Sequence, residues 1–234
     1  MVSVSILVPA YKEEKLIENN ISKLRKSISS ITPDFEIIVV DDNSGDNTSA
    51  IINSMDDARI RCIHFSNGPS RRENLAEAMK QASNEIILFM DADLSTELKH
   101  LPKLIDEVEN HADIAIGSRF MGKKPIRKLS RDIVSLLYNN FMRIYFGSKV
   151  KDHQCGFKAF KRKVIIDLIG DMGYDSGFVR GWFWDAELLI RAQRKRYRIA
   201  EFPVEWKNNR PSTVRVRREM RMILYILGLK HRLD

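Results

Sequence analysis

A short apolar run that ends in two carboxylates constrains this chain more than any other feature. Residues 86–90 read Ile-Ile-Leu-Phe-Met, and Asp91, Ala92 and Asp93 follow directly. A run of this length is typical of a buried strand and is too short for a confident helix assignment. Ligands of open α/β sheets bind beyond the carboxyl ends of the strands, so we expect both aspartates at a binding edge.

The two aspartates have a functional and a structural interpretation. Two hard oxygen donors suit Mg²⁺ or Mn²⁺, because such an ion is commonly held by one or two carboxylates plus the phosphates of a substrate. In the alternative, Asp93 caps the helix that follows and Asp91 belongs to a surface turn. The motif by itself leaves both interpretations open.

Strand-like and helical segments alternate over the first half of the chain. We expect strands at 2–8, 35–40, 59–65, 85–90 and 112–117. Helical patterns cover 13–31, 71–83 and 98–110. This alternation predicts βαβ units and a mainly parallel sheet. No G-x-G-x-x-G follows the first strand and no Walker A sequence is present, so a dinucleotide-binding Rossmann protein is disfavoured.

The second half is less regular. Helical patterns cover 128–146, 184–196 and 216–229, and strand-like segments cover 156–160 and 197–204. The first and last of these helices are amphipathic and basic. They are either ordinary surface helices packed on a core or helices that lie in a membrane interface. The chain shows no internal repeat and no linker, which favours a single domain over residues 1–234.

Charge and cysteine content narrow the class of partner. The formal net charge of +8 predicts affinity for phosphates, nucleic acid or a membrane surface. Cys62 and Cys155 have neither metal-ligand spacing nor a disulfide framework, so we expect reduced thiols in a cytosolic setting. No signal-peptide pattern opens the chain, and no apolar stretch approaches the roughly 20 residues of a membrane span.

Six segments of the chain, in order, carry a resemblance to a known family. They are VSILVPAYKEE (4–14), IIVVDDNSGDNT (37–48), MDAD (90–93), IGSR (116–119), DHQCGFK (152–158) and GWFWDAELL (181–189). Together they resemble inverting family 2 glycosyltransferases with the GT-A fold. The last two narrow the resemblance to the dolichyl-phosphate mannose and glucose synthase branch. The resemblance implies a mostly parallel, Rossmann-like α/β sheet flanked by helices, with peripheral amphipathic helices. It also implies a nucleotide-sugar-binding half at 1–120 and an acceptor-side half at 121–234.

The resemblance assigns donor-binding residues by position. Pro9, Tyr11 and Glu13 match residues that hold the nucleotide base and ribose, and a tyrosine ring can stack on a base. Val40 and Asp42 match base contacts at the end of the second strand, where a carboxylate can accept from a base N–H. The implied metal and diphosphate site consists of Asp91, Ala92 and Asp93, with Asp91 and Asp93 as metal ligands and Asp93 as the best candidate for a direct ligand.

Other matched residues belong to the acceptor side and to a loop. Arg119 matches a residue near the sugar or the acceptor phosphate, and Asp185 is the candidate base, with capping of its helix as the alternative. Arg210 and Ser212 match a loop that closes over the diphosphate. The chain departs from the family where Thr213 and Val214 replace the usual lysine after that serine. It departs again at 67–72, where the family often has Gly-Lys-Gly, and at Ser95, where some members have a glutamine.

The implied reaction is metal-dependent, inverting transfer of a hexose from a nucleotide-diphosphate sugar of the UDP-glucose or GDP-mannose type to dolichyl or polyprenyl phosphate. The acceptor is a phosphate monoester with a second pKa of about 6, so it is already an anionic nucleophile at neutral pH. One alternative is a family 2 enzyme that acts on a saccharide hydroxyl. The other is a basic, non-enzymatic nucleic-acid-binding module, which the lack of an RRM, KH or helix-turn-helix pattern disfavours.

The expected partners follow from this reaction. They are a nucleotide sugar, a polyprenyl phosphate and a membrane surface, with Mg²⁺ or Mn²⁺ as cofactor and no nucleic acid. A membrane-anchoring subunit is a further candidate partner. The expected location is cytoplasmic, with peripheral attachment to the cytoplasmic face of a membrane.

Overall fold

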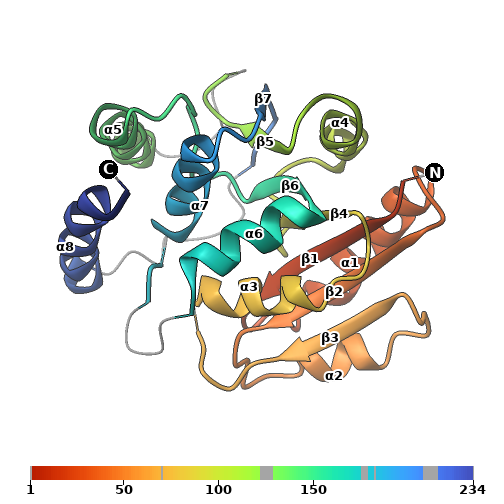
Figure 1. Cartoon of the computed structure of the whole chain (residues 1–234). Coiled ribbons are helices and arrows are strands. Elements are labelled where there is room, and N and C mark those ends of the chain that lie inside the picture. Colours follow the sequence, from red (N-terminus) through yellow and green to blue (C-terminus); the bar gives the residue numbers. More distant parts are fainter. Residues whose placement is uncertain are drawn as a thin grey trace.

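The computed structural model of the chain describes residues 2–69, 71–121, 129–174, 179–181, 183–207 and 216–233. Within these residues a seven-stranded sheet has the order β3-β2-β1-β4-β6-β5-β7 (Figure 1). Its strands are β1 (Val4–Ala10), β2 (Phe35–Asp41), β3 (Ile60–His64), β4 (Ile86–Met90), β5 (Ile114–Ser118), β6 (Phe157–Lys161) and β7 (Ile199–Pro203).

Six of these strands run in one direction. β1 pairs in parallel with β2 and β4, β2 with β3, and β5 with β7. β6 lies between β4 and β5 and is antiparallel to both. The expectation of a mostly parallel sheet is therefore confirmed, and every predicted strand is found with ends that differ by at most two residues.

The described helices flank the sheet. Two of them, α2 and α6, were not predicted, because α2 is one short segment among turn residues and α6 follows β6 without an intervening turn residue. The helices are α1 (Ile17–Ser29), α2 (Thr48–Asn53), α3 (Arg72–Lys80), α4 (Leu101–Asp106), α5 (Leu129–Phe146), α6 (Arg162–Met172), α7 (Phe183–Arg194) and α8 (Val216–Leu233). A 3₁₀ turn, η1 (Leu98–His100), precedes α4, and a π turn, η2 (Glu107–His111), follows it.

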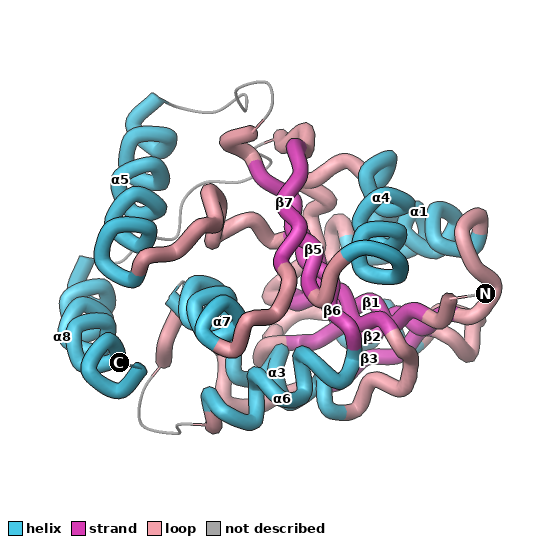
Figure 2. The backbone as a smooth tube through the Cα atoms, turned by 45° about the horizontal axis from the view of Figure 1, so that its top comes forward, coloured by secondary structure: helices cyan, strands magenta, loops and turns pink. Residues whose placement is uncertain are grey.

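Each face of the sheet is covered by helices, which explains why its central strands are apolar almost throughout. In β4, Ile86, Leu88 and Met90 enter the core under α1, α2 and α4. Ile87 and Phe89 point to the opposite core, under α3, α6 and α7. Figure 2 shows these two helical layers on either side of the strands.

Helices α5 and α8 pack beside α7 at one end of the molecule, as both views show (Figures 1 and 2). Met142 and Phe146 of α5, Phe183 of α7 and Leu229 of α8 share a separate apolar core. Among the described helices, none is both long enough and apolar enough to cross a membrane.

Candidate active site

The carboxylate motif lies where β4 ends, in a turn whose shape is fixed by hydrogen bonds. The backbone N–H of Leu94 donates to the carbonyl of Asp91 at 3.0 Å. The backbone N–H and the hydroxyl of Ser95 donate to Asp93 Oδ1 at 2.9 and 2.6 Å. Asn20 of α1 donates to the carbonyl of Ala92 at 2.9 Å. These bonds fix the orientation of the Asp93 carboxylate before any ligand binds.

Asp91 occupies a space that only glycine at position 156 leaves open. A Cβ atom on Gly156 would lie 2.3 Å from Asp91 Oδ2. Burial raises the pKa of Asp91, and the nearby carboxylates of Asp93 and Asp185 raise it further. A bound cation stabilises a buried carboxylate with a raised pKa more than it stabilises an exposed carboxylate.

The donor set fits a hard divalent ion. Asp91 and Asp93 supply carboxylate oxygens, as Mg²⁺ and Mn²⁺ prefer. The described residues contain no group of three or more histidine, cysteine, aspartate or glutamate side chains able to hold a metal. The remaining coordination positions would therefore belong to water and to phosphate oxygens, which is the usual arrangement for magnesium with a phosphorylated substrate.

Asp42 follows the last residue of β2, and its carboxylate accepts hydrogen bonds from the start of α3. Its Oδ1 accepts a hydrogen bond from Asn74 Nδ2 at 2.5 Å, and its Oδ2 accepts from the backbone N–H of Arg71 at 3.0 Å. A Cβ atom on Gly68 would lie 2.1 Å from the carbonyl oxygen of Asp42, so the backbone at Gly68 packs directly against the backbone of Asp42. The structure thus brings the N-terminus of α3 to the same edge as the carboxylate motif.

The remaining residues predicted to bind the nucleotide lie at the ends of β1 and β2. Pro9 is paired with Val40 across the two strands. The Val40 side chain is 1% exposed in the core, so a contact of Val40 with a base must come from its backbone. Tyr11 is 38% exposed. Glu13 is buried, and its backbone N–H donates to Thr48 Oγ1 at 2.8 Å.

Arg119 follows β5 and is held in a buried ion pair. Its Nε and Nη2 donate to the two carboxylate oxygens of Asp152, each at 2.7 Å, and its backbone N–H donates to the same group. Burial alone would raise the pKa of Asp152, but Arg119 outweighs burial and lowers it. Glu201 of β7 accepts the backbone N–H of Asp152 at 2.9 Å. Arg119 is therefore fixed in place at the sheet edge.

Asp185, in the first turn of α7, joins two cations. Lys158 Nζ donates to Asp185 Oδ1 at 2.9 Å and also to the carbonyl of Cys155. Arg72 Nε lies 3.3 Å from Asp185 Oδ2. Lys158 and Asp185 are buried, whereas the Arg72 side chain is 25% exposed. Asp185 thus pairs with two cations, Lys158 and Arg72, and Lys158 is fully buried.

The structure gathers most of the predicted residues and adds others that were not predicted. Arg210 and Ser212 lie outside the described residues. Arg72, Asp152 and Lys158 join the site through contacts that were not predicted from the sequence. Lys158 could have been recognised from the sequence, because it interrupts the apolar residues of the predicted strand 156–160 and a buried charge is almost always paired.

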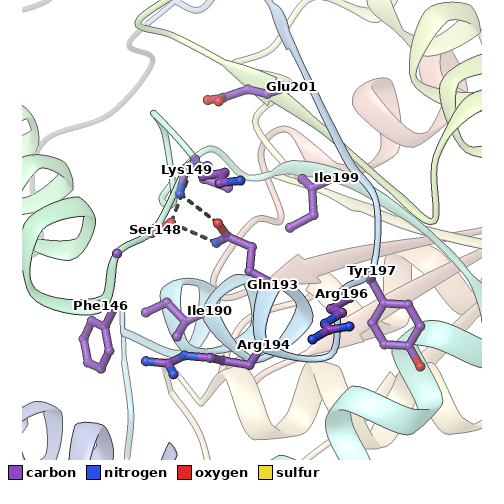
Figure 3. A pocket seen from close by; sticks show the side chains of 12 residues that line it. Phe146, Ser148, Lys149, Ile190, Gln193, Arg194, Arg196, Tyr197, Ile199 and Glu201 are labelled. Carbon is purple, nitrogen blue, oxygen red and sulfur yellow. Dashed lines mark hydrogen bonds between the residues drawn. The ribbon is translucent and has the colours of Figure 1, made fainter. Parts of the chain in front are cut away.

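A separate cavity of about 560 Å³ lies beside β7, between the end of α5 and the end of α7 (Figure 3). Gln193 spans part of it, donating from Nε2 to Ser148 Oγ at 2.9 Å and accepting from the backbone N–H of Lys149 at 2.7 Å. None of the predicted site residues lines this cavity. This cavity is therefore separate from the site that contains Asp91 and Asp93.

Comparison with known proteins places this geometry in a family. Residues 5–169 match glycosyl transferase family 2. Glycosyltransferase AglD of Haloferax volcanii is 37% identical over 212 residues, which are 88% of this chain and 33% of AglD. Dolichyl-phosphate beta-glucosyltransferase ALG5C of Trichomonas vaginalis is 28% identical over 244 residues, covering 97% of this chain and 71% of that protein. The chain therefore spans about a third of AglD.

A solved structure agrees with the fold. Glucosyl-3-phosphoglycerate synthase from Mycobacterium tuberculosis, in complex with Mg²⁺ and UDP, superposes with a TM-score of 0.69 at 19% identity. The match covers 97% of this chain and 79% of that one. The same enzyme has also been solved with Mn²⁺ and UDP. The sheet order, the family match and this likeness agree: the chain belongs to glycosyl transferase family 2 and has the GT-A fold.

Proposed function

We propose that this chain transfers a hexose from a nucleotide-diphosphate sugar to dolichyl or polyprenyl phosphate, with inversion at the anomeric carbon. The observation that carries the proposal is the Asp91 and Asp93 pair at the sheet edge, with the cations Arg72, Arg119 and Lys158 around it. The similarity to a dolichyl-phosphate beta-glucosyltransferase supports a lipid phosphate as the acceptor.

On the donor side, Asp91 and Asp93 would hold Mg²⁺ or Mn²⁺ with the diphosphate. The bound ion would offset the charge that develops on the departing nucleoside diphosphate. Tyr11 offers a ring on which a base can stack, and Asp42 offers carboxylate oxygens to a base N–H. Pro9, Glu13, Val40 and Ala92 complete this proposed donor site, and Arg210 and Ser212 would close over the diphosphate.

On the acceptor side, the nucleophile is the phosphate oxygen itself. Its anionic form predominates at neutral pH, so the protein need not remove a proton, as it must from a sugar hydroxyl. Asp185 already holds Lys158 and Arg72, so we assign it the task of positioning these cations and not that of a base. Arg119, fixed by Asp152, would hold the acceptor phosphate or the sugar.

The two parts of the chain divide these tasks. Residues 1–120 would bind the donor, and residues 121–234 would supply the acceptor side. Lys158 from β6 and Asp185 from α7 bring the second part to the sheet edge. UDP-glucose and GDP-mannose are the two candidate donor types.

A transfer assay tests the reaction. Labelled UDP- and GDP-sugars are supplied with Mn²⁺ or Mg²⁺ and either dolichyl phosphate, dolichol or an oligosaccharide. We expect labelled lipid from one donor with dolichyl phosphate and none with dolichol. Label on the oligosaccharide, with none on the lipid, would favour the alternative of a family 2 enzyme that acts on a saccharide hydroxyl.

A membrane surface is the proposed setting of the reaction. α5 exposes Ile144 (85%), Leu137 (64%) and Val134 (61%), and their spacing places them on one side of the helix. α8 lies against α5, where Tyr145 donates to the carbonyl of Leu227 at 3.4 Å. An apolar helix face on a chain with a net charge of +8 fits the interface of an anionic bilayer.

Vesicle co-sedimentation tests this setting. We expect binding to anionic vesicles at low salt. The double variant Leu137→Glu/Ile144→Glu should lose it, and Leu16→Glu, an exposed apolar position before α1, should retain it. A wild-type chain that ignores such vesicles contradicts the proposal. Attachment to the cytoplasmic face, and a membrane-anchoring subunit at the same surface, are further parts of this proposal.

A further inference from the structure

Arg72 lies in the middle of the charged residues at the sheet edge. It is the first residue of α3, directly after Arg71, whose backbone N–H is held by Asp42. Its Nε lies 3.3 Å from Asp185 Oδ2, and its guanidinium carbon lies 5.7 Å from the centre of the Phe89 ring. The side chain thus reaches from the nucleotide side of the site to the acceptor side.

Three carboxylates act on this guanidinium. Burial alone would lower the pKa of Arg72. The charges of Asp185, Asp91 and Asp42 outweigh burial and raise it, so the group stays protonated. One of these, Asp91, belongs to the proposed metal site, and another, Asp42, belongs to the proposed base site. Arg72 is therefore close to the place where a diphosphate between a base and a metal would lie.

The other cations at this edge are less available to a ligand. Lys158 is 0% exposed and is held by Asp185 and by the carbonyl of Cys155. Arg119 is 8% exposed and has its Nε and Nη2 in the pair with Asp152. Arg72 is 25% exposed, and among the described residues Asp185 is the one carboxylate within ion-pair distance of it.

We propose that Arg72 binds the diphosphate of the donor through its guanidinium while its Nε stays with Asp185. This inference rests on the proposed function and adds a phosphate-binding residue to the donor site. A guanidinium presents five N–H donors in a plane, and it pairs with two phosphate oxygens at once. The ion pair with Asp185 and the Phe89 ring fix that plane in advance, which reduces the entropy lost on binding.

The test distinguishes binding of the diphosphate from binding of the base. Calorimetry with Mn²⁺ measures the affinity of wild type, Arg72→Gln and Arg72→Lys for UDP and GDP, for uridine and guanosine, and for pyrophosphate. The matched control is Arg61→Gln. It removes a partly exposed arginine that pairs with Glu36 at 3.2 Å and lies away from Asp91 and Asp93.

We expect Arg72→Gln to weaken nucleoside-diphosphate and pyrophosphate binding about 10- to 100-fold, the range for lost charge-assisted hydrogen bonds. Nucleoside affinity should change less than about twofold, which also shows that the variant is folded. Arg72→Lys should retain part of the diphosphate affinity, since it keeps the charge without the fork. Arg61→Gln should match wild type.

Three results would overturn the inference. Equal diphosphate affinity in wild type and Arg72→Gln refutes the contact and leaves the proposed function standing. An equal loss for nucleoside and diphosphate means that Arg72 only maintains the local structure. A wild-type chain that binds neither nucleoside diphosphate nor pyrophosphate removes the donor site and this inference together.

Discussion

Replacing Lys158 by methionine should destabilise the fold strongly, because the change leaves a buried carboxylate short of one cation. Lys158 and Asp185 are 0% and 4% exposed, and their charged atoms lie 2.9 Å apart. Removing one partner of such a pair costs about 3–5 kcal/mol. Asp185 keeps Arg72 at 3.3 Å, so we expect the Lys158→Met loss near the lower end, about 3 kcal/mol.

Removing the other partner, Asp185, should lower the free energy of unfolding further. Asp185→Asn leaves the Lys158 ammonium fully buried with the carbonyl of Cys155 and a neutral amide, so we expect a loss of about 4–5 kcal/mol. The double variant Lys158→Met/Asp185→Asn removes both charges. Its loss should fall short of the sum of the single losses by about 1–3 kcal/mol, as for other residues in contact.

Urea unfolding of the four proteins, followed by circular dichroism, measures these differences. Additive losses in the double variant would refute the coupling between Lys158 and Asp185. So would a Lys158→Met protein as stable as wild type. The order of the two single losses tests whether Arg72 supports Asp185 in solution.

Further predictions concern the metal site and a buried histidine. Gly156→Ala should abolish Mn²⁺-dependent nucleotide binding in calorimetry, because the new Cβ would meet Asp91 Oδ2 at 2.3 Å, whereas Gly170→Ala, with open space at that position, should bind normally. Unchanged Mn²⁺ affinity in Gly156→Ala would contradict this account of Asp91. Burial lowers the pKa of His153 to about 4, below the value near 6.5 in an unfolded chain. The unfolded state therefore binds more protons between these values, and stability should fall by about 2 kcal/mol through this residue as pH drops from about 7.5 to 5. Urea unfolding of His153→Gln should show a correspondingly flatter pH dependence, and an identical pH dependence in both proteins would count against a neutral, buried His153.

The strands could be predicted because both faces of the sheet are buried. A strand such as β4 then has no polar position to interrupt it, and its end is marked by Asp91. Strand order could not be predicted in the same way. β6 enters between β4 and β5 in the opposite direction, and that pairing depends on contacts between distant parts of the chain.

The site shows the same division. Asp91 and Asp93 could be proposed as site residues from the apolar strand that they follow, and Asp42 from the resemblance of its segment to the family. The cations Arg72 and Lys158 could not be predicted, because they come from separate segments and meet at Asp185 only in the folded chain. Helix α6 carries Val164, Leu168 and other apolar residues at helical spacing, so the sequence does contain a signal for this helix.

We propose that Asp91 and Asp93 form a metal-dependent sugar-transfer site for a lipid phosphate. The most direct measurement is the initial rate of labelled hexose transfer to dolichyl phosphate, with and without Mn²⁺, in wild type and in Asp93→Ala. We predict transfer by wild type that stops when a chelator is added, and none by Asp93→Ala at any Mn²⁺ concentration. Near-normal turnover by Asp93→Ala, or wild-type transfer that a chelator does not affect, would contradict the account.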